Sequence, residues 1–257
     1  MRQRLVEIPQ NKDTGPQMHT QKKHKQIRAV LFDMDNTLLD FMAAKASACR
    51  AVAGKLGKDD GLDLLNRFLK NKAEHESHLI IADYMGSLGI YDGELFFEVC
   101  ETYDLTKLEA IEAYDGIPEL LTYLKTNRFA LGVVTNARRV NAEMRLEKAG
   151  LRRFFDAVVT ADDTEQIKPD PRHLEVAIGR LGVIPEETIF VGDSIEMDIK
   201  AAKRLGMKTA YAKYGDCSND HKDEAPDYVL QRPEDLIKIL DQARGEYHER
   251  RRYHTQQ

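Results

Sequence analysis

Two aspartates separated by a single residue, Asp33 and Asp35, directly follow a short and mostly apolar run at residues 28–32. The run has no helical spacing, which is typical of a strand buried on both faces of a parallel sheet. Because unpaired carboxylates are costly to bury, the pair is expected where the strand leaves the sheet, close to a cation or to hydrogen-bond donors. The pair alone leaves two interpretations open: a reactive site, or acidic side chains that only cap a turn.

Polar side chains also follow two further predicted strands. Thr135 and Asn136 come after the apolar residues 130–134, and Asp193 comes shortly after residues 188–191. Lys168 stands before a predicted helix. Since the carboxyl ends of parallel strands meet at one edge of a sheet, three carboxylates, a hydroxyl and an ammonium are expected to converge there.

Three carboxylates gathered in this way require a cation. Two like charges about 4 Å apart repel by roughly 4 kcal/mol at an effective dielectric constant near 20. Oxygen ligands without His or Cys favour Mg²⁺, which keeps several waters and binds one or two carboxylates together with a substrate phosphate. The sequence therefore predicts Mg²⁺ as a cofactor.

The elements that must position these residues fall into two groups. Between the first and second strands the chain is predicted to be entirely helical, and such an insertion is typical of a separate small domain. Its helices are expected at about residues 41–57, 62–72, 77–88, 93–102 and 105–113.

From residue 115 onward, strands alternate with helices. This order predicts a parallel, three-layer α/β sheet with right-handed crossovers. Further strands are expected at residues 130–134, 157–159, 188–191, 208–212 and 227–230, and the last helix at about 234–243. The predicted division is a polar extension (1–27), an α/β core (28–40 and 114–243), a helical insertion (41–113) and a basic tail (244–257).

The composition is that of an ordinary globular protein, with 42% hydrophobic and 32% charged residues in 257. No apolar run approaches the roughly 18 residues of a membrane span, and residues 1–27 lack the apolar core of a secretory signal, so we expect no membrane partner and a cytoplasmic location. Three widely spaced cysteines indicate neither a disulfide framework nor a thiolate metal site.

Charge is distributed unevenly along the chain. Residues 1–27 hold six Lys or Arg against two Asp or Glu, residues 244–257 hold four against two, and the whole chain carries −5, which leaves −11 on the body between them. An acidic body argues against a nucleic-acid substrate, because phosphate backbones require broad basic surfaces. The basic ends are expected to be solvated and poorly ordered.

Four segments together resemble the motifs of the haloacid dehalogenase (HAD) superfamily. They are FDMDNTL at residues 32–38, Thr135, Lys168 with Pro169, and GDSIEMD at residues 192–198, in the order of that family. The resemblance extends over residues 28–243. It implies a Rossmann-like core with a helical cap inserted after the first motif.

The resemblance also implies catalytic roles. Asp33 would attack phosphorus and form an aspartyl-phosphate, and Asp35 would protonate the leaving oxygen and then activate water. Thr135 and the backbone N–H of Asn136 would hold the phosphoryl oxygens, while Lys168 would offset negative charge.

For the metal, the resemblance implies Asp33, the backbone carbonyl of Asp35, and Asp193 as Mg²⁺ ligands. Thr37 and Ser194 are candidates for supporting contacts around these ligands. Asp198 is either such a support, an alternative ligand, or an acid that only stabilises the first turn of a helix.

The same residues favour one branch of the family. The dehalogenases lack an acid at the position of Asp35 and use no metal, whereas this chain keeps both Asp35 and Asp193.

The expected activity is hydrolysis of a small phosphorylated metabolite of the phosphoglycolate, sugar phosphate or nucleotide monophosphate class, by a monomer or homodimer. A sugar-phosphate mutase is the alternative, although Thr37 stands where mutases usually carry a non-hydroxyl residue. A non-catalytic regulatory module would lack a motif residue, and none is missing. Candidate specificity residues are Arg50, Arg67, His75, His78 and Tyr84, although surface charge and core packing explain each of them at least as well.

Overall fold

Six parallel strands form the centre of the molecule. The computed structural model describes residues 25–71, 77–217 and 225–254. The strand order is β3-β2-β1-β4-β5-β6, and every neighbouring pair is parallel. This topology confirms the predicted Rossmann-like sheet, with β1 and β4 at its middle. The strands are β1 (Ala29–Phe32), β2 (Ala130–Val134), β3 (Ala157–Val159), β4 (Thr188–Gly192), β5 (Lys208–Ala212) and β6 (Tyr228–Leu230).

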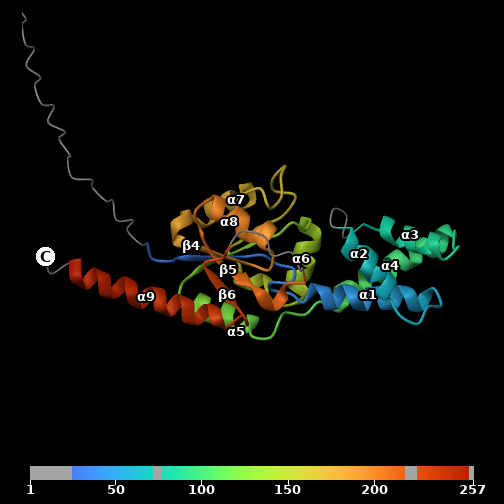
Figure 1. The fold of residues 1–257 in the computed structure, drawn as a ribbon, viewed down its shortest axis with the longest axis horizontal. Helices are drawn as coiled ribbons and strands as arrows, with labels where there is room; N and C mark the ends of the chain where they lie inside the picture. The colour runs from blue at the N-terminus through green and yellow to red at the C-terminus, as the bar shows by residue number, and fades with distance from the viewer. Residues whose placement is uncertain (1–24, 72–76, 218–224, 255–257) are drawn as a thin grey trace, which may run out of the picture.

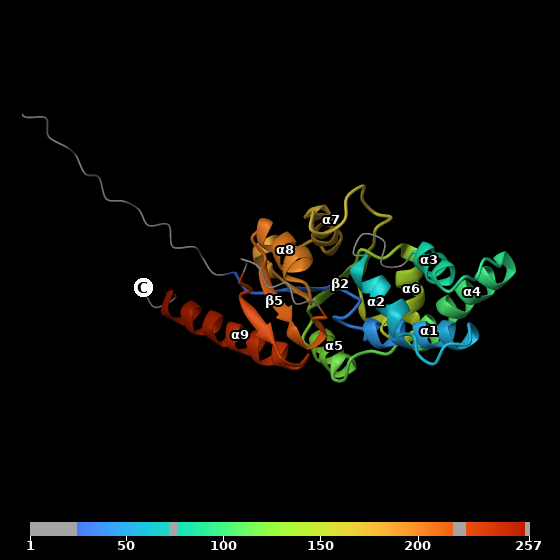
Figure 2. The same ribbon diagram turned by 45° about the vertical axis from the view of Figure 1, so that its right-hand side comes forward.

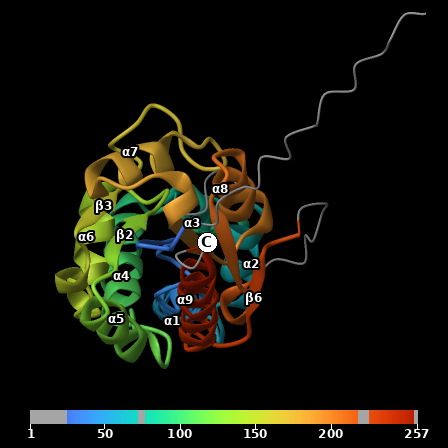
Figure 3. The ribbon, with the colours of Figure 1, turned by 90° about the vertical axis from the view of Figure 1, so that its left-hand side faces the viewer.

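Helices cover both faces of the sheet (Figure 3). One face carries α5 (Ile117–Thr126), α6 (Arg139–Lys148) and α9 (Asp235–His254), and the other carries α7 (Arg172–Leu181) and α8 (Lys200–Arg204). Because successive side chains of a strand point to opposite faces, Val30 and Phe32 of β1 join the first layer, whereas Leu31 joins the second. Both layers are apolar, which explains why β1 lacks polar positions.

A helical segment lies beyond one end of the sheet, on the right in Figures 1 and 2. Its members are α1 (Phe41–Lys55), α2 (Leu62–Lys70), α3 (Leu79–Ser87) and α4 (Gly93–Glu109), and they enclose a hydrophobic core of their own. The two stretches of chain that connect this segment to the sheet domain are hydrogen-bonded to each other. The Asp40 N–H donates to the Glu112 carbonyl (2.9 Å), and the Tyr114 N–H donates to the Leu38 carbonyl (3.1 Å). The predicted all-helical insertion is confirmed.

One helix of the insertion was predicted wrongly. The sequence suggested separate helices at 93–102 and 105–113, but α4 runs unbroken from Gly93 to Glu109. Tyr103, which is fully buried and stacked on Phe68 at 5.0 Å between ring centroids, lies at the expected break. No Gly or Pro follows it before Glu109, so the apolar stripe continues without interruption.

The C-terminal helix is also longer than predicted. Instead of ending near residue 243, α9 continues to His254, so the basic tail is helical over residues 244–254. Arg244 holds this part of the helix, because its guanidinium donates to the side chain and carbonyl oxygens of Asn127 (2.8 and 2.9 Å) and lies 4.4 Å from the Phe129 ring centroid. Residues 1–24 and 255–257 of the predicted polar ends lie outside the described residues. Among those described, no helix is long and apolar enough to cross a membrane.

Candidate active site

The site is built around Asp33, which follows the central strand β1. Its backbone N–H continues the sheet by donating to the Val191 carbonyl of β4 (2.8 Å). The Lys168 ammonium donates to the Asp33 carboxylate and, at 2.7 Å, to Asp198 Oδ1. All three side chains are almost fully buried. An ammonium therefore meets carboxylates at the strand ends, and one of them is Asp198, which was not among the three carboxylates expected to converge there.

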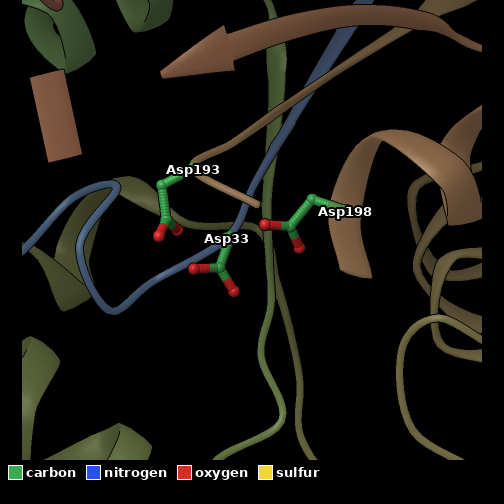
Figure 4. A group of neighbouring side chains, drawn as sticks. All are labelled: Asp33, Asp193 and Asp198. Carbon is green, nitrogen blue, oxygen red and sulfur yellow. The ribbon is translucent and has the colours of Figure 1, made fainter. Parts of the chain in front are cut away.

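Three carboxylates face one another at this point. Asp33, Asp193 and Asp198 each offer an oxygen, and these oxygens lie within 4.8 Å of one another (Figure 4). The sequence left three roles open for Asp198: a support for the ligands, an alternative ligand, or a purely structural acid. Here its carboxylate points into the cluster, where it also accepts from the Ser194 N–H at 3.0 Å. An all-carboxylate set of this kind matches the oxygen ligands of Mg²⁺.

The electrostatics of the cluster favour an added cation. Burial raises the pKa of Asp33 from 3.8 to about 7, although Lys168 acts to lower it. Burial, then the Asp33 and Asp198 charges, raise the pKa of Asp193 well above its usual range. Burial alone would lower the pKa of Lys168, but Asp198 and Asp33 raise it above its usual value, so the lysine stays charged. One ammonium thus faces three carboxylates, and the remaining negative charge would attract a divalent ion.

Asn136 has a role that the sequence did not reveal. Its amide donates to the Lys168 carbonyl (3.1 Å) and its side-chain oxygen accepts from the Lys168 N–H (3.0 Å). This reciprocal pair fixes the loop that carries the lysine. Thr135 is buried beside it at the end of β2, and its hydroxyl oxygen accepts from the Ala137 N–H at 3.1 Å.

The turn after Asp33 is held by half-buried hydrogen bonds. The Thr37 hydroxyl donates to Asp193 Oδ1 (3.0 Å), and the Tyr214 hydroxyl donates to the Thr37 carbonyl (2.8 Å). A side chain on Gly215 would collide with the Asn36 carbonyl, because a Cβ there would lie only 1.6 Å from that oxygen. Ser194 caps the next turn, where its hydroxyl oxygen accepts from the Met197 N–H at 3.2 Å. Thr37 thus contacts one carboxylate of the cluster directly, and Ser194 caps the turn that leads to Asp198.

Gly192 is required for a similar reason. A Cβ at this last residue of β4 would lie 2.5 Å from the Asp198 side chain. The glycine therefore leaves the space through which Asp198 reaches the cluster. The turn that carries Asp198 is a π-helical turn (Ile195–Ile199) directly ahead of α8.

Asp35, the second aspartate of the motif, contacts a residue that sequence reasoning missed. Arg145 of α6 donates from Nη1 to Asp35 Oδ2 at 2.6 Å, across 110 residues of sequence. The sequence does contain an indication of this residue, because Arg145 is a charged residue on the helix face formed by the buried Ala142 and Leu146.

The candidate specificity residues pair with their own neighbours. Arg67 contacts Asp63 and Asp83, and His78 contacts Asp104. Arg50, which is exposed, donates to Ser47, and Tyr84 is buried in the core of the insertion. His75 lies outside the described residues. None of the four described candidates contacts the carboxylate cluster.

His173 of α7 is a buried imidazole close to the charge of Lys168. Its exposed fraction is 0%, and in the part of the chain that the structure describes neither ring nitrogen has a hydrogen-bond partner. Burial, followed by the charge of Lys168, lowers its pKa from 6.5 to about 4. The folded protein therefore holds this imidazole neutral where an unfolded chain would protonate it.

This difference predicts a pH-dependent loss of stability. As the pH falls below about 6.5, the unfolded state binds a proton that the folded state binds only near pH 4, so the free energy of unfolding decreases. Between about pH 7 and pH 5 we expect the wild type to lose roughly 2 kcal/mol more than His173→Leu, as measured by urea unfolding. If the free energy of unfolding of the two proteins falls by the same amount between these pH values, the prediction is wrong.

Comparisons with known proteins show what this chain resembles. The chain matches the family of haloacid dehalogenase-like hydrolases over residues 30–212. It is 29% identical over 221 residues to a glyceraldehyde 3-phosphate phosphatase of Methanocaldococcus jannaschii, with 83% of this chain and 97% of the relative covered. It is 32% identical over 225 residues to the pyrophosphatase PpaX of Halalkalibacterium halodurans, with 84% and 97% covered.

Solved structures show the same likeness. The HAD-hydrolase YfnB of Bacillus subtilis, bound to magnesium, superposes with a TM-score of 0.70 at 25% identity, covering 84% of this chain and 100% of that chain. A Thermotoga maritima protein assigned as a beta-phosphoglucomutase gives a TM-score of 0.70 at 27% identity, with 84% and 99% covered.

Proposed function

This chain belongs to the haloacid dehalogenase-like hydrolases, and from that premise we propose that it is a Mg²⁺-dependent phosphatase that acts on a small phosphorylated metabolite through an aspartyl-phosphate. Its class is that of a phosphoric monoester hydrolase, in keeping with the phosphatases among its relatives. The observation that carries the proposal is the Lys168 ammonium between Asp33 and Asp198, with Asp193 completing the carboxylate cluster.

In the first step, an Asp33 carboxylate oxygen attacks phosphorus. The bond between phosphorus and the ester oxygen breaks, and its electron pair stays on that oxygen, which takes the proton of the Asp35 carboxyl. The products are the alcohol, a phosphoryl group on Asp33, and Asp35 as a carboxylate. Thr135 and the backbone N–H of Asn136 are proposed to hold the phosphoryl oxygens, and Lys168 to offset their charge.

In the second step, water replaces Asp33 on phosphorus. Asp35 takes a proton from the water as its oxygen attacks, the bond from phosphorus to Asp33 breaks, and the electron pair returns to the Asp33 carboxylate. Inorganic phosphate leaves with both aspartates in their starting protonation states. Lys168 keeps one cation beside Asp33 during the cycle.

The donor set fits a magnesium ion. Asp33 and Asp193 are the proposed ligands together with the Asp35 backbone carbonyl, and the position of Asp198 makes it a further candidate. When bound, Mg²⁺ would shield the Asp33 carboxylate from the negative charge of the phosphate. Thr37 and Lys168 orient Asp193 and Asp198 in the cluster through hydrogen bonds that the protein itself supplies.

The substrate is proposed to be small, because the helical insertion stands beyond the strand ends and would restrict access to the site. The relatives named above act on different compounds, a triose phosphate and pyrophosphate, so they support the class of substrate rather than one member of it. Phosphoglycolate, sugar phosphates and nucleotide monophosphates remain the proposed range. The domain limits, the cytoplasmic location and a monomeric or dimeric state likewise remain predictions.

Metal dependence gives a direct test. The metal-free protein is expected to release at most about a hundredth of the phosphate that it releases from p-nitrophenyl phosphate with excess Mg²⁺, because the shielding of Asp33 is lost. Colorimetric phosphate release with EDTA, followed by Mg²⁺ add-back, measures this ratio. Equal rates with and without metal would contradict the proposal. If the rates differ as expected, a panel of phosphorylated metabolites compared by kcat/KM would identify the substrate.

A sugar-phosphate mutase is the second candidate, supported by the structural likeness to the Thermotoga maritima protein. A mutase would return the phosphoryl group of Asp33 to a sugar hydroxyl, so it would interconvert two sugar phosphates with little net release of phosphate. Incubation with glucose 1-phosphate followed by separation of sugar phosphates distinguishes the two activities.

A further inference from the structure

Arg145 is a buried cation that the mechanism above leaves without a catalytic task. Its exposed fraction is 3%, and its guanidinium lies on the face of α6 that packs into the sheet domain. Nη1 donates to Asp35 Oδ2 at 2.6 Å, which is a short, charge-assisted hydrogen bond. The guanidinium carbon also lies over the Phe41 ring, 4.2 Å from its centroid.

These two contacts join three parts of the molecule. Asp35 belongs to the turn after β1, Arg145 to α6, and Phe41 is the first residue of α1, where the helical insertion begins. The Phe41 ring is itself buried, with 4% exposed. The guanidinium is therefore confined between a carboxylate and an aromatic face, and its planar shape allows it to satisfy both.

A purely structural explanation accounts poorly for this arrangement. Ala142 and Leu146, its neighbours on the same helix face, are fully buried apolar residues, and an apolar residue at 145 would fill the same layer without the cost of removing a guanidinium from water. A buried ion pair of this kind contributes little net stability, but it fixes the orientation of the groups it joins. The orientation that it fixes here is that of the Asp35 carboxyl.

We propose that Arg145 is a positioning residue that holds the Asp35 carboxyl where the leaving oxygen departs, and that Phe41 holds Arg145 in turn. The proposal rests on the function proposed above, in which Asp35 gives its proton to that oxygen as the bond from phosphorus to oxygen breaks. Proton transfer requires the two oxygens to be within hydrogen-bond reach, so a carboxyl that is free to rotate transfers its proton less often.

This role has a specific kinetic signature. A leaving group that is stable as an anion, such as p-nitrophenolate, departs without a proton, whereas an alkoxide requires one. The value of kcat/KM reports the steps up to departure of the leaving group, so it does not include hydrolysis of the aspartyl-phosphate. Loss of positioning should therefore lower kcat/KM for alkyl phosphates far more than for p-nitrophenyl phosphate.

The test compares Arg145→Met with the wild type on p-nitrophenyl phosphate, phenyl phosphate and methyl phosphate. We expect kcat/KM to fall about 100-fold for methyl phosphate, less than about 3-fold for p-nitrophenyl phosphate, and by an intermediate factor for phenyl phosphate. Arg145→Lys, which keeps the charge, should lose less kcat/KM for methyl phosphate than Arg145→Met does. Phe41→Leu should show a weaker loss of kcat/KM, again largest for methyl phosphate and smallest for p-nitrophenyl phosphate. Arg153→Met, which removes an exposed arginine shortly after α6, is the matched control.

The outcomes separate this proposal from the one on which it rests. Equal factors for all three substrates in Arg145→Met would show a general structural effect and overturn the positioning role, as would no change in any of them. If Arg145→Met does not fold, Arg145→Lys and Phe41→Leu decide by the same comparison. A wild type that releases no phosphate from any of the substrates would instead refute the phosphatase activity.

Discussion

Asp33→Asn is expected to lower kcat for phosphate release by at least about 1,000-fold, since the amide cannot attack phosphorus. Asparagine has nearly the same shape as aspartate, so the loss would come from chemistry rather than packing. The residue lies beside Lys168 at the end of the central strand, where its backbone N–H is bonded to the Val191 carbonyl of β4.

The folded state should tolerate this substitution. Burial raises the pKa of Asp33 to about 7, which shows that its charge is costly in the protein without metal. Removing that charge leaves Lys168 paired with Asp198. We therefore expect the Tm of metal-free Asp33→Asn to equal or exceed that of the wild type. Asp59→Asn, the same change at an exposed position, is the control and should keep full activity. Residual activity of Asp33→Asn within tenfold of the wild type would show that Asp33 is not the nucleophile.

Lys168→Met is expected to affect both activity and stability. Among the described residues, this lysine is the only ammonium that contacts the cluster, and it forms ion pairs with two buried carboxylates. Without it, kcat should fall about 100-fold because the charge on Asp33 and the phosphate is no longer offset. The free energy of unfolding should fall by roughly 3 kcal/mol, since a buried pair has lost one partner.

Urea unfolding and phosphate release measure these two effects. Excess Mg²⁺ should restore part of the stability of Lys168→Met, because an ion that binds only the folded state stabilises it by mass action. Lys148→Met, at an exposed position near the end of α6, provides the matched control. A stability of Lys168→Met equal to that of the wild type without metal would contradict the electrostatic account of the cluster.

The parts of the site that could be predicted from the sequence are those with a local signal. The apolar run before Asp33 and the alternation of strands with helices place Asp33, Thr135 and Asp193 at strand ends, and the sheet brings those ends together. The helical insertion could also be predicted from the sequence, because no β-like alternation of apolar and polar residues occurs between residues 41 and 113.

The parts that could not be predicted depend on contacts between distant residues. Arg145 meets Asp35 across 110 residues, and nothing near either one in the sequence specifies the other. Asn136 was assigned a backbone role, whereas its side chain fixes Lys168 across a separation of 32. Asp198 joins the cluster only because Gly192 leaves room for it and a π-helical turn directs it inward, and sequence periodicity indicates neither.

The most direct test of a phosphatase that works through Asp33 is to trap the intermediate. Enzyme mixed with Mg²⁺ and phenyl phosphate is quenched in acid during turnover, digested and analysed by mass spectrometry. We expect the peptide that contains Asp33 to carry one phosphoryl group that hydroxylamine removes, and the same peptide of Asp33→Asn to carry none. A phosphoryl group on another residue, or sustained hydrolysis with no phosphorylated peptide at any quench time, would contradict the mechanism.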